Sequence, residues 1–265
     1  MKGVEIGKIH PTALVSDKAT IGGNVTIGAN AIVYDNVEVG DNSIIGPGSY
    51  IGEPIASYYG NPDYSNPPLS IGSNSLIRSG SIIYAGSIIG NNFECGHRVT
   101  IRENTKIGDH SRIGTLSDVQ GHCEIGNYVR LHSCVHVGQK SYIGNFVWIS
   151  PYAVLANDPH PPSNILIGAT IEDFAVIAIK AVILSGVKIG RDAMIGAMAL
   201  VSCDVPAEAV MCGIPAKQIA TIRDIKSKYT EEPPYPWREH FERGMPWEGI
   251  GYKEWRRSQR NETPF

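Results

Sequence analysis

Residues 119–155 read VQGHCEIGNYVRLHSCVHVGQKSYIGNFVWISPYAVL, and this stretch decides the fold. Every sixth residue in it is aliphatic: Val119, Ile125, Leu131, Val137, Ile143, Ile149 and Leu155. The residue four positions after each of the first six is small or β-branched: Cys123, Val129, Val135, Ser141, Val147 and Ala153. An α-helix repeats every 3.6 residues and a half-buried strand every 2, so a period of six fits neither. It predicts a chain that forms a short strand, turns and repeats.

The same register extends in both directions along the chain. Every sixth residue is aliphatic or Cys from Ile9 to Ile51 and again from Ile71 to Leu155, and the pattern resumes over 171–201. Three strands form one coil of 18 residues, with the aliphatic and the small residue pointing inward. One coil cannot bury its own faces, so many coils must stack. The prediction is an all-β solenoid of about ten coils.

The repeated hexad is aliphatic, Gly, any, any, small, any, as in Ile125-Gly126 and Ile143-Gly144. It resembles the hexapeptide-repeat acyltransferase family over roughly residues 6–206. The resemblance implies a left-handed parallel β-helix over 1–206. The left-handedness comes from the resemblance, since periodicity alone does not give the hand of the coil. The resemblance also implies a homotrimer with active sites between neighbouring solenoids.

Composition excludes several classes of function. The formal net charge is −3 and hydrophobic residues make up 42% of the 265 residues, so the chain is neither disordered nor a basic nucleic-acid binder. No apolar run is long enough to cross a membrane, and the first residues lack the apolar core of a signal peptide. The cysteines number 5, and an odd count does not suggest a disulfide framework. We therefore expect a cytoplasmic protein with no membrane or nucleic-acid partner.

Two loops interrupt the repeat, and a different sequence follows it. The loop over 53–70 is rich in Pro, Asn and Tyr, and Tyr58, Tyr59 and Tyr64 suit a nucleobase or a protein surface. The second loop spans 156–170. Residues 207–230 are expected to form a cap with a short helix over 217–229. Residues 231–265 hold seven aromatic residues, so we expect this extension to pack on the solenoid or on another subunit.

Three short motifs resemble the acetyl-CoA-dependent members of the family. They are ANDPHP at 156–161, GAMALV at 196–201 and GIPAK at 213–217, in which Ile214 stands where the family has Asn. The middle of the chain is most similar to nucleotide-linked amino-sugar N-acetyltransferases, such as the dTDP-3-amino-3,6-dideoxyhexose type. The resemblance implies acetyl-CoA as co-substrate, a dTDP- or UDP-amino deoxysugar as acceptor, and no metal. It suggests that backbone N–H groups near Ala178 or Ala197 stabilise the reacting thioester. The final coils and cap also offer cationic residues for the CoA phosphates, with a solvated surface role as the alternative for each: Lys180, Lys188, Arg191 and Lys217.

A solenoid stacks residues that are 18 positions apart, which brings polar residues together beneath the second loop. One such column holds Asn157, Gln139 and Glu103, and the next holds Asp158 and His122. A carboxylate such as Asp158 can orient an attacking amine and accept its proton, while amides fix the reacting groups. We therefore predict catalysis by Asn157, Asp158 and Gln139, with Glu103 and His122 contacting the substrate. An Asx turn that merely opens the loop is the alternative interpretation of 157–159.

Histidine chemistry offers two further hypotheses. An O-acyltransferase, or a long-chain acyltransferase of the same fold, would use His132 as general base, although the family's usual position for that histidine is Ser133 here. His136 is expected to have an ordinary surface or interface role. A γ-carbonic-anhydrase-like metalloprotein would use three histidines from among His97, His122, His132, His136 and His160. A non-catalytic scaffold is a further alternative, because the fold alone does not choose a function.

Overall fold

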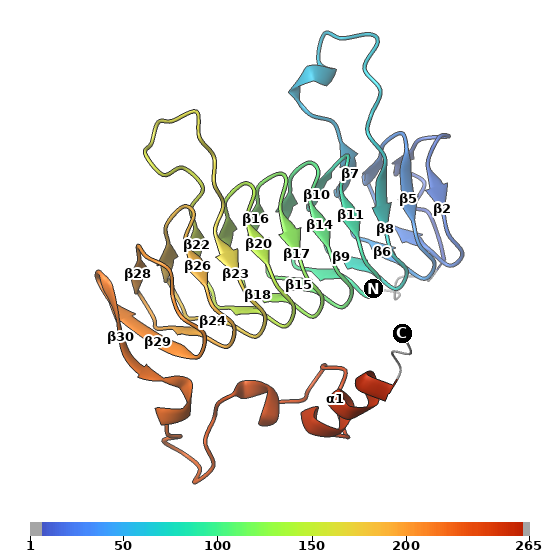
Figure 1. The fold of residues 1–265 in the computed structure, drawn as a ribbon. Helices are drawn as coiled ribbons and strands as arrows, with labels where there is room; N and C mark the ends of the chain where they lie inside the picture. Colours follow the sequence, from blue (N-terminus) through green and yellow to red (C-terminus); the bar gives the residue numbers. More distant parts are fainter. Residues whose placement is uncertain (1–6, 262–265) are drawn as a thin grey trace.

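The computed structural model describes residues 7–261, and its main body is a parallel β-solenoid of about eleven turns (Figure 1). Within these residues three sheets form its sides, with ten, nine and eleven strands, and the strands are parallel apart from the last one of sheet III. The chain visits the sheets in the order I, II, III as far as Val201. The fold class predicted from the hexad is confirmed.

Most strands are only two residues long, as expected for a hexad that spends its other four residues on a turn. Sheet I consists of β1 (Leu14–Val15), β4 (Ile32–Val33), β7 (Tyr50–Glu53), β10 (Ile82–Tyr84), β13 (Thr100–Ile101), β16 (Asp118–Val119), β19 (His136–Val137), β22 (Val154–Leu155), β25 (Val182–Ile183) and β28 (Leu200–Val201). Sheet II consists of β2 (Thr20–Ile21), β5 (Val37–Val39), β8 (Leu69–Ile71), β11 (Ile88–Ile89), β14 (Lys106–Ile107), β17 (Glu124–Ile125), β20 (Tyr142–Ile143), β23 (Thr170–Ile171) and β26 (Lys188–Ile189). Sheet III consists of β3 (Thr26–Ile27), β6 (Ile44–Ile45), β9 (Leu76–Ile77), β12 (Glu94–Cys95), β15 (Arg112–Ile113), β18 (Arg130–Leu131), β21 (Trp148–Ile149), β24 (Val176–Ile177), β27 (Met194–Ile195), β29 (Ala209–Gly213) and β30 (Ala216–Thr221).

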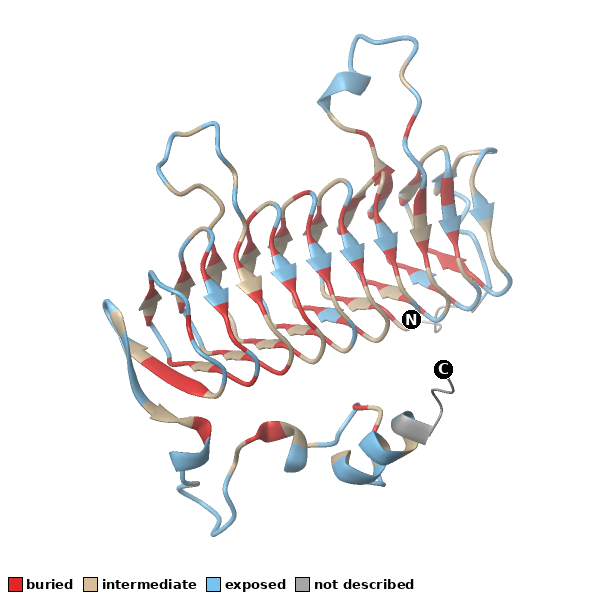
Figure 2. Cartoon of the chain, viewed as in Figure 1, coloured by how far each residue is buried: buried red, intermediate tan, exposed pale blue. Residues whose placement is uncertain are grey.

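The core is a narrow column inside the coils (Figure 2). Each aliphatic key residue pairs with the key residue of the next coil, as in Val119↔Val137. From Ile27 onward these residues are buried. The small residues of the second column are buried too, and their hydroxyls are satisfied: Ser111 Oγ donates to the carbonyl O of Gly126 (2.8 Å) and accepts from Val129 N (3.0 Å). Serine therefore fits this position because it bonds to the backbone of the next coil.

Both loops leave the solenoid at the same corner, between sheets I and II (Figure 1). The first joins β7 to β8 and contains the 3-10 helix η1 (Ala56–Tyr58), and the second joins β22 to β23. Five inter-strand steps of about 4.8 Å separate their starting strands, so the loops stand roughly 24 Å apart along the axis.

The helix expected over 217–229 is wrong. Residues 216–221 form β30, which pairs antiparallel with β29, and the 3-10 helix η2 (Ile222–Asp224) follows. The edge of β29 offers backbone hydrogen-bond partners to this segment. Pairing with that strand therefore overrides the local preference for a helix. Within residues 7–261 the α-helix is α1 (Tyr252–Asn261), which lies in the extension after η3 (Trp237–Glu239).

The extension packs along one corner of the solenoid, between sheets II and III. Four stacked rings form a ladder on that corner, with centroids 4.6 to 5.2 Å apart: His110, Tyr128, Phe146 and Phe174. Trp237 and Trp247 of the extension are buried against this ladder. Arg238 forms an ion pair with Asp192, a buried residue of the solenoid. The extension is thus part of the folded body.

Candidate functional site

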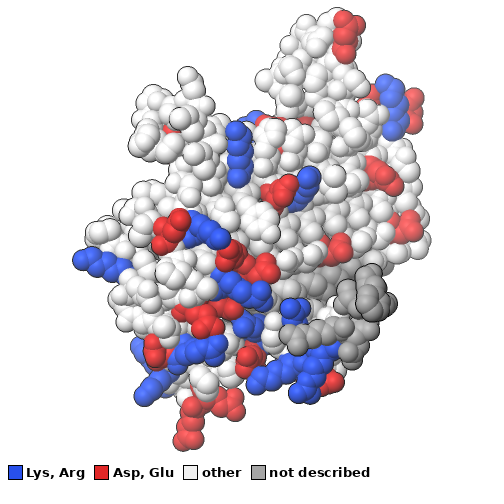
Figure 3. All heavy atoms as spheres, in the orientation of Figure 1, with Lys and Arg blue, Asp and Glu red and all other residues white. Residues whose placement is uncertain are grey.

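Four residues stack at the corner between sheets I and II, on the stretch between the two loops. Glu103, Gly121, Gln139 and Asn157 each lie two residues after a buried residue of sheet I, so the hexad places them in one column. Figure 3 shows this edge of the surface hollowed between the two loops, and the loops themselves carry few charged side chains. We call this column the saddle.

Glycine at position 121 makes room for an acidic side chain in the saddle. A Cβ at Gly121 would lie 3.0 Å from Oε1 of Glu103, which is tighter than ordinary packing. The same carboxylate accepts two hydrogen bonds from Arg102, from Nε at 2.9 Å and from Nη2 at 3.0 Å. Arg102 also lies over the ring of Tyr84, at 5.4 Å from its centroid. This two-point pairing fixes the Glu103 carboxylate in place.

A histidine and an aspartate pair on the face of sheet I, beside the saddle. His136 and Asp118 occupy matching outward positions on β19 and β16. His136 Nδ1 lies 3.1 Å from Asp118 Oδ2, and Gln120 Nε2 donates to the same oxygen at 2.6 Å. The bond with His136, followed by that with Gln120, lowers the pKa of Asp118 against the opposing effect of burial. An ionised carboxylate that holds Nδ1–H leaves Nε2 of the imidazole as a proton acceptor.

The second loop is shaped by Asp158. Its carboxylate accepts from Ser163 Oγ (2.8 Å), from Ser163 N (3.1 Å) and from His160 N (3.0 Å). The bond with the Ser163 hydroxyl is the main reason that the pKa of Asp158 is lowered. Asn157 holds the far side of the loop, because its carbonyl accepts from Ile167 N at 2.8 Å. The arrangement is an Asx turn, and the catalytic role of Asp158 stays a prediction.

The predicted substrate residues lie at the same corner but not all in one place. Tyr58 packs edge to face on Tyr59 and Tyr64 within the first loop, at 5.2 and 5.5 Å between ring centroids. Tyr64 is tied to Asn66 through its hydroxyl (3.1 Å), and Tyr59 is largely exposed. His122 is exposed at the tip of the corner, one residue beyond Gly121. The loop tyrosines thus flank one end of the saddle.

The residues predicted to bind the cofactor separate into groups. Ala178, Lys180 and Ala197 lie at the corner between sheets III and I, following β24 and β27. Lys188 is on sheet II, paired with Glu172 at 2.7 Å, and Arg191 lies over the Phe174 ring at 5.0 Å. Lys217 is exposed on β30. The structure therefore brings Ala178, Lys180 and Ala197 together at one corner, whereas the remaining three residues lie elsewhere.

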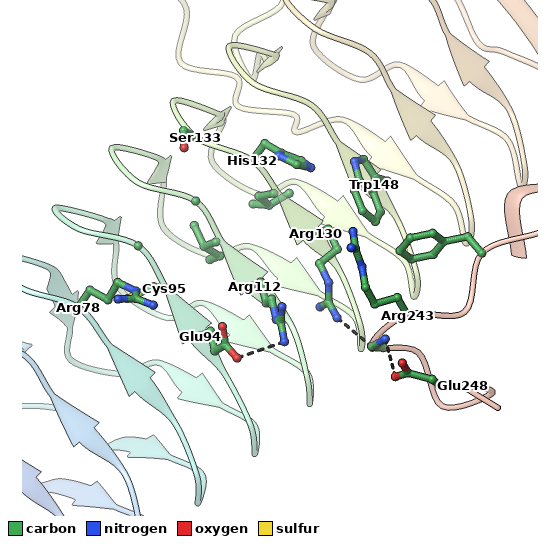
Figure 4. Close-up of a pocket in the computed structure, with 16 residues that line it drawn as sticks. Arg78, Glu94, Cys95, Arg112, Arg130, His132, Ser133, Trp148, Arg243 and Glu248 are labelled. Carbon is green, nitrogen blue, oxygen red and sulfur yellow. Dashed lines mark hydrogen bonds and ion pairs between the residues drawn. The ribbon is translucent and has the colours of Figure 1, made fainter. Parts of the chain in front are cut away.

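His132 lies away from the saddle, in a groove on sheet III (Figure 4). Its ring is 5.3 Å from that of Trp148, and burial lowers its pKa. Among the described residues His132 has no carboxylate partner.

Residues 7–261 contain no cluster of three or more His, Cys, Asp or Glu side chains arranged to hold a metal. They also contain no helix long and apolar enough to span a bilayer.

Sequence reasoning missed the His136–Asp118 pair, along with Gln120 and Arg102. The signal was present, since Asp118 and His136 are 18 residues apart and occupy the same position in the hexad. A step of 18 residues pairs Asp118 with His136, just as it pairs Gln139 with Asn157.

Comparison with known proteins supports the family. The model of the bacterial transferase hexapeptide (six repeats) matches residues 18–53 and 104–139. A curated relative, 2,3,4,5-tetrahydropyridine-2,6-dicarboxylate N-acetyltransferase of Staphylococcus aureus (strain JH9), is 41% identical over 88 residues. That match spans 33% of this chain and 36% of the relative's length.

A solved structure extends the likeness to most of the fold. The UDP-N-acetylglucosamine acyltransferase of Arabidopsis matches with a TM-score of 0.50 and 19% identity, covering 81% of this chain and 74% of that chain. At that identity the likeness concerns the fold alone. Repeat, solenoid and family-model match agree, and the chain is therefore similar to the bacterial transferase hexapeptide family over residues 18–53 and 104–139.

Proposed function

We propose that this protein is an acetyl-CoA-dependent N-acetyltransferase that acts on the amino group of a nucleotide-linked (dTDP- or UDP-) amino deoxysugar. The observation that carries the proposal is the His136–Asp118 pair beside the saddle. The Staphylococcus aureus relative, whose name is that of an N-acetyltransferase, supports an amine as acceptor. The proposal includes a homotrimer and requires no metal.

The reaction joins two bound substrates. The neutral amine attacks the thioester carbonyl carbon, a C–N bond forms, and the C–S bond then breaks to release CoA. The amine loses one proton, which His136 Nε2 accepts and passes to the departing sulfur. Asp118 holds Nδ1–H and stabilises the imidazolium that forms meanwhile. Positioning of both substrates contributes much of the rate.

The saddle residues take supporting roles in this proposal. Gln139 and Asn157 orient the amine and the sugar, Glu103 accepts a hydrogen bond from a sugar hydroxyl, and Asp158 keeps the loop in shape. The amide N–H of Ala178 already donates to the carbonyl O of Ile195 at 2.9 Å. Ala197 is therefore the better candidate for a backbone donor to the tetrahedral oxyanion.

A second candidate function is O-acyl transfer. A hydroxyl must lose its proton as it attacks, and a histidine held by a carboxylate is the group that removes it. His136 meets this requirement better than His132, which lacks such a partner among the described residues.

The test measures acetyl-CoA turnover with dTDP- and UDP-amino sugars and with their hydroxyl analogues. We expect activity with an amine, and a loss of about 100-fold or more in kcat for His136→Ala. Asp118→Asn and Asn157→Ala should also lower kcat, whereas His132→Ala should change it much less. Asp158→Asn tests whether that carboxylate does more than shape the loop.

Two results would overturn the proposal. Acceptance of the hydroxyl analogue and not the amine would replace it by O-acyl transfer. Full activity in folded His136→Ala would remove the assigned proton acceptor.

A further inference from the structure

A groove of about 560 Å³ runs between the outer face of sheet III and the extension (Figure 4). Its floor comes from strands β9 to β21, and its other wall comes from residues 241–248. It is on a different face from the saddle, and its arginines take no part in the acyl-transfer step proposed above.

Four arginines line the groove, three from the solenoid and one from the extension: Arg78, Arg112, Arg130 and Arg243. Two glutamates, Glu94 and Glu248, are the acidic residues in its lining. Within the described part of the chain, Arg112 is the one of the four with a carboxylate partner, Glu94 at 3.2 Å. Arg112 and Arg130 occupy matching positions on adjacent strands. Like charges placed side by side on a sheet repel each other, so this arrangement favours a bound anion.

One hydrogen bond joins the two walls of the groove, and further bonds fix the residues that make it. Arg130 Nη2 donates to the carbonyl O of Gly244 at 3.1 Å, and its Nη1 donates to the carbonyl O of His110. Gly244 N donates to Glu248 Oε2 at 2.8 Å. Burial lowers the pKa of Arg130 to about 10, which still leaves it charged at neutral pH. Arg130 thus donates to backbone carbonyls and fixes the groove, while Arg78 and Arg243 have no carboxylate partner within the described part of the chain.

One end of the groove is aromatic. Trp148 follows Arg130 at the next matching position on sheet III, and it contacts Phe241 at 5.7 Å and His132 at 5.3 Å between ring centroids. Beyond Trp148 the groove continues into an adjoining hollow of about 450 Å³ lined by Val176, Met194 and rings of the extension. Flat rings beside guanidinium groups form a surface on which a nucleobase stacks.

We infer that this groove binds the nucleoside diphosphate portion of one of the two substrates. The arginines donate to the diphosphate oxygens, and Trp148 with Phe241 receives the base. From β9 to β21 the floor crosses four inter-strand steps, roughly 19 Å, which suits an extended nucleotide better than a small dicarboxylate. This inference rests on the proposed function, because that function supplies the two substrates that contain a nucleoside diphosphate: CoA and the dTDP- or UDP-sugar.

Calorimetric titration of the full chain tests it, with dTDP, UDP, CoA, pyrophosphate and pyridine-2,6-dicarboxylate as probes. Arg112→Gln and Arg243→Gln should each weaken binding of the nucleotide by roughly tenfold or more. Trp148→Leu should weaken the nucleotide and leave pyrophosphate unchanged. Arg256→Gln, an exposed arginine on α1, is the matched control and should change nothing.

The probes separate the sources. Weaker CoA binding with dTDP and UDP unchanged assigns the groove to the acyl donor, and the reverse assigns it to the sugar nucleotide. The inference is overturned if no nucleotide responds to the arginine variants, if pyrophosphate binds as tightly as dTDP, UDP and CoA, or if only the dicarboxylate responds.

Binding is measured without turnover, so the two ideas fail separately. A protein that binds dTDP in the groove and transfers no acetyl group loses the proposed function and keeps this inference. If Arg112→Gln and Arg243→Gln transfer acetyl normally and bind the nucleotides with unchanged affinity, the groove inference is lost and the proposed function is kept.

Discussion

His132 is half-buried in the groove, where its ring packs on Trp148. Burial disfavours the imidazolium and lowers the pKa of His132 below its ordinary value. Between the folded and the unfolded pKa the unfolded chain binds more protons, so stability falls as the pH drops below about 6.5. The urea concentration at the unfolding midpoint should fall between pH 7.5 and pH 5.5 in the wild type. We expect a smaller fall in His132→Gln.

His160, an exposed residue of the second loop, provides the control. His160→Gln should leave the acid sensitivity as in the wild type. If the urea midpoint changes equally with pH in the wild type and in His132→Gln, protonation of the half-buried ring does not contribute to the acid sensitivity.

Residue positions could be predicted where the hexad alone decides them. The inward positions of Cys95 and Cys123 follow from counting in sixes, and the structure confirms them. Hydrogen-bond partners are harder to predict. Asp158 bonds within its own loop because Ser163 lies five residues on, a geometry that depends on the path of an aperiodic loop.

The sequence predicts that the extension packs on another surface, but it does not decide whether that surface is the solenoid or a second subunit. Its aromatic content predicts burial, but a segment without periodicity does not name its partner surface. The partner is the ladder of Tyr128, Phe146 and Phe174 at successive positions of one corner. Reading the third residue after each aliphatic key position would have revealed this ladder.

Trp247 is the centre of that packing. It is buried, contacts Phe146 and Tyr252, and donates from Nε1 to the carbonyl O of Phe241 at 2.9 Å. Trp247→Ala should weaken docking of the extension by about 3 to 5 kcal/mol. We expect faster proteolysis near 231–236 and loss of nucleotide binding in the groove, while the solenoid stays folded by circular dichroism.

Tyr229 is the matched control, because 94% of it is exposed just before the extension. Tyr229→Ala should leave proteolysis unchanged. If Trp247→Ala unfolds the whole chain in one transition, the extension and the solenoid form a single cooperative unit.

At the scale of the whole molecule, the three outer faces differ in chemistry. Sheet II is a charged face with cross-strand pairs such as Lys106 with Glu124 at 3.1 Å. Sheet III is covered in part by the extension. Outward positions of sheet I are largely apolar, as at Ile82, Val154, Val182 and Leu200. A face of this composition, with the His136–Asp118 pair in its middle, supports sheet I as the contact between copies in the proposed homotrimer.

Val182→Glu tests this contact. A glutamate at that outward position of β25 would lose its hydration at every interface, a cost of several kcal/mol per carboxylate. We expect sedimentation velocity to show a trimer for the wild type and monomers for Val182→Glu. The same change on the charged face, Ile88→Glu on β11, where the native side chain is 53% exposed, should keep the trimer. A trimer in Val182→Glu together with monomers in Ile88→Glu would move the contact to sheet II, and a monomeric wild type would require the saddle to work within one copy.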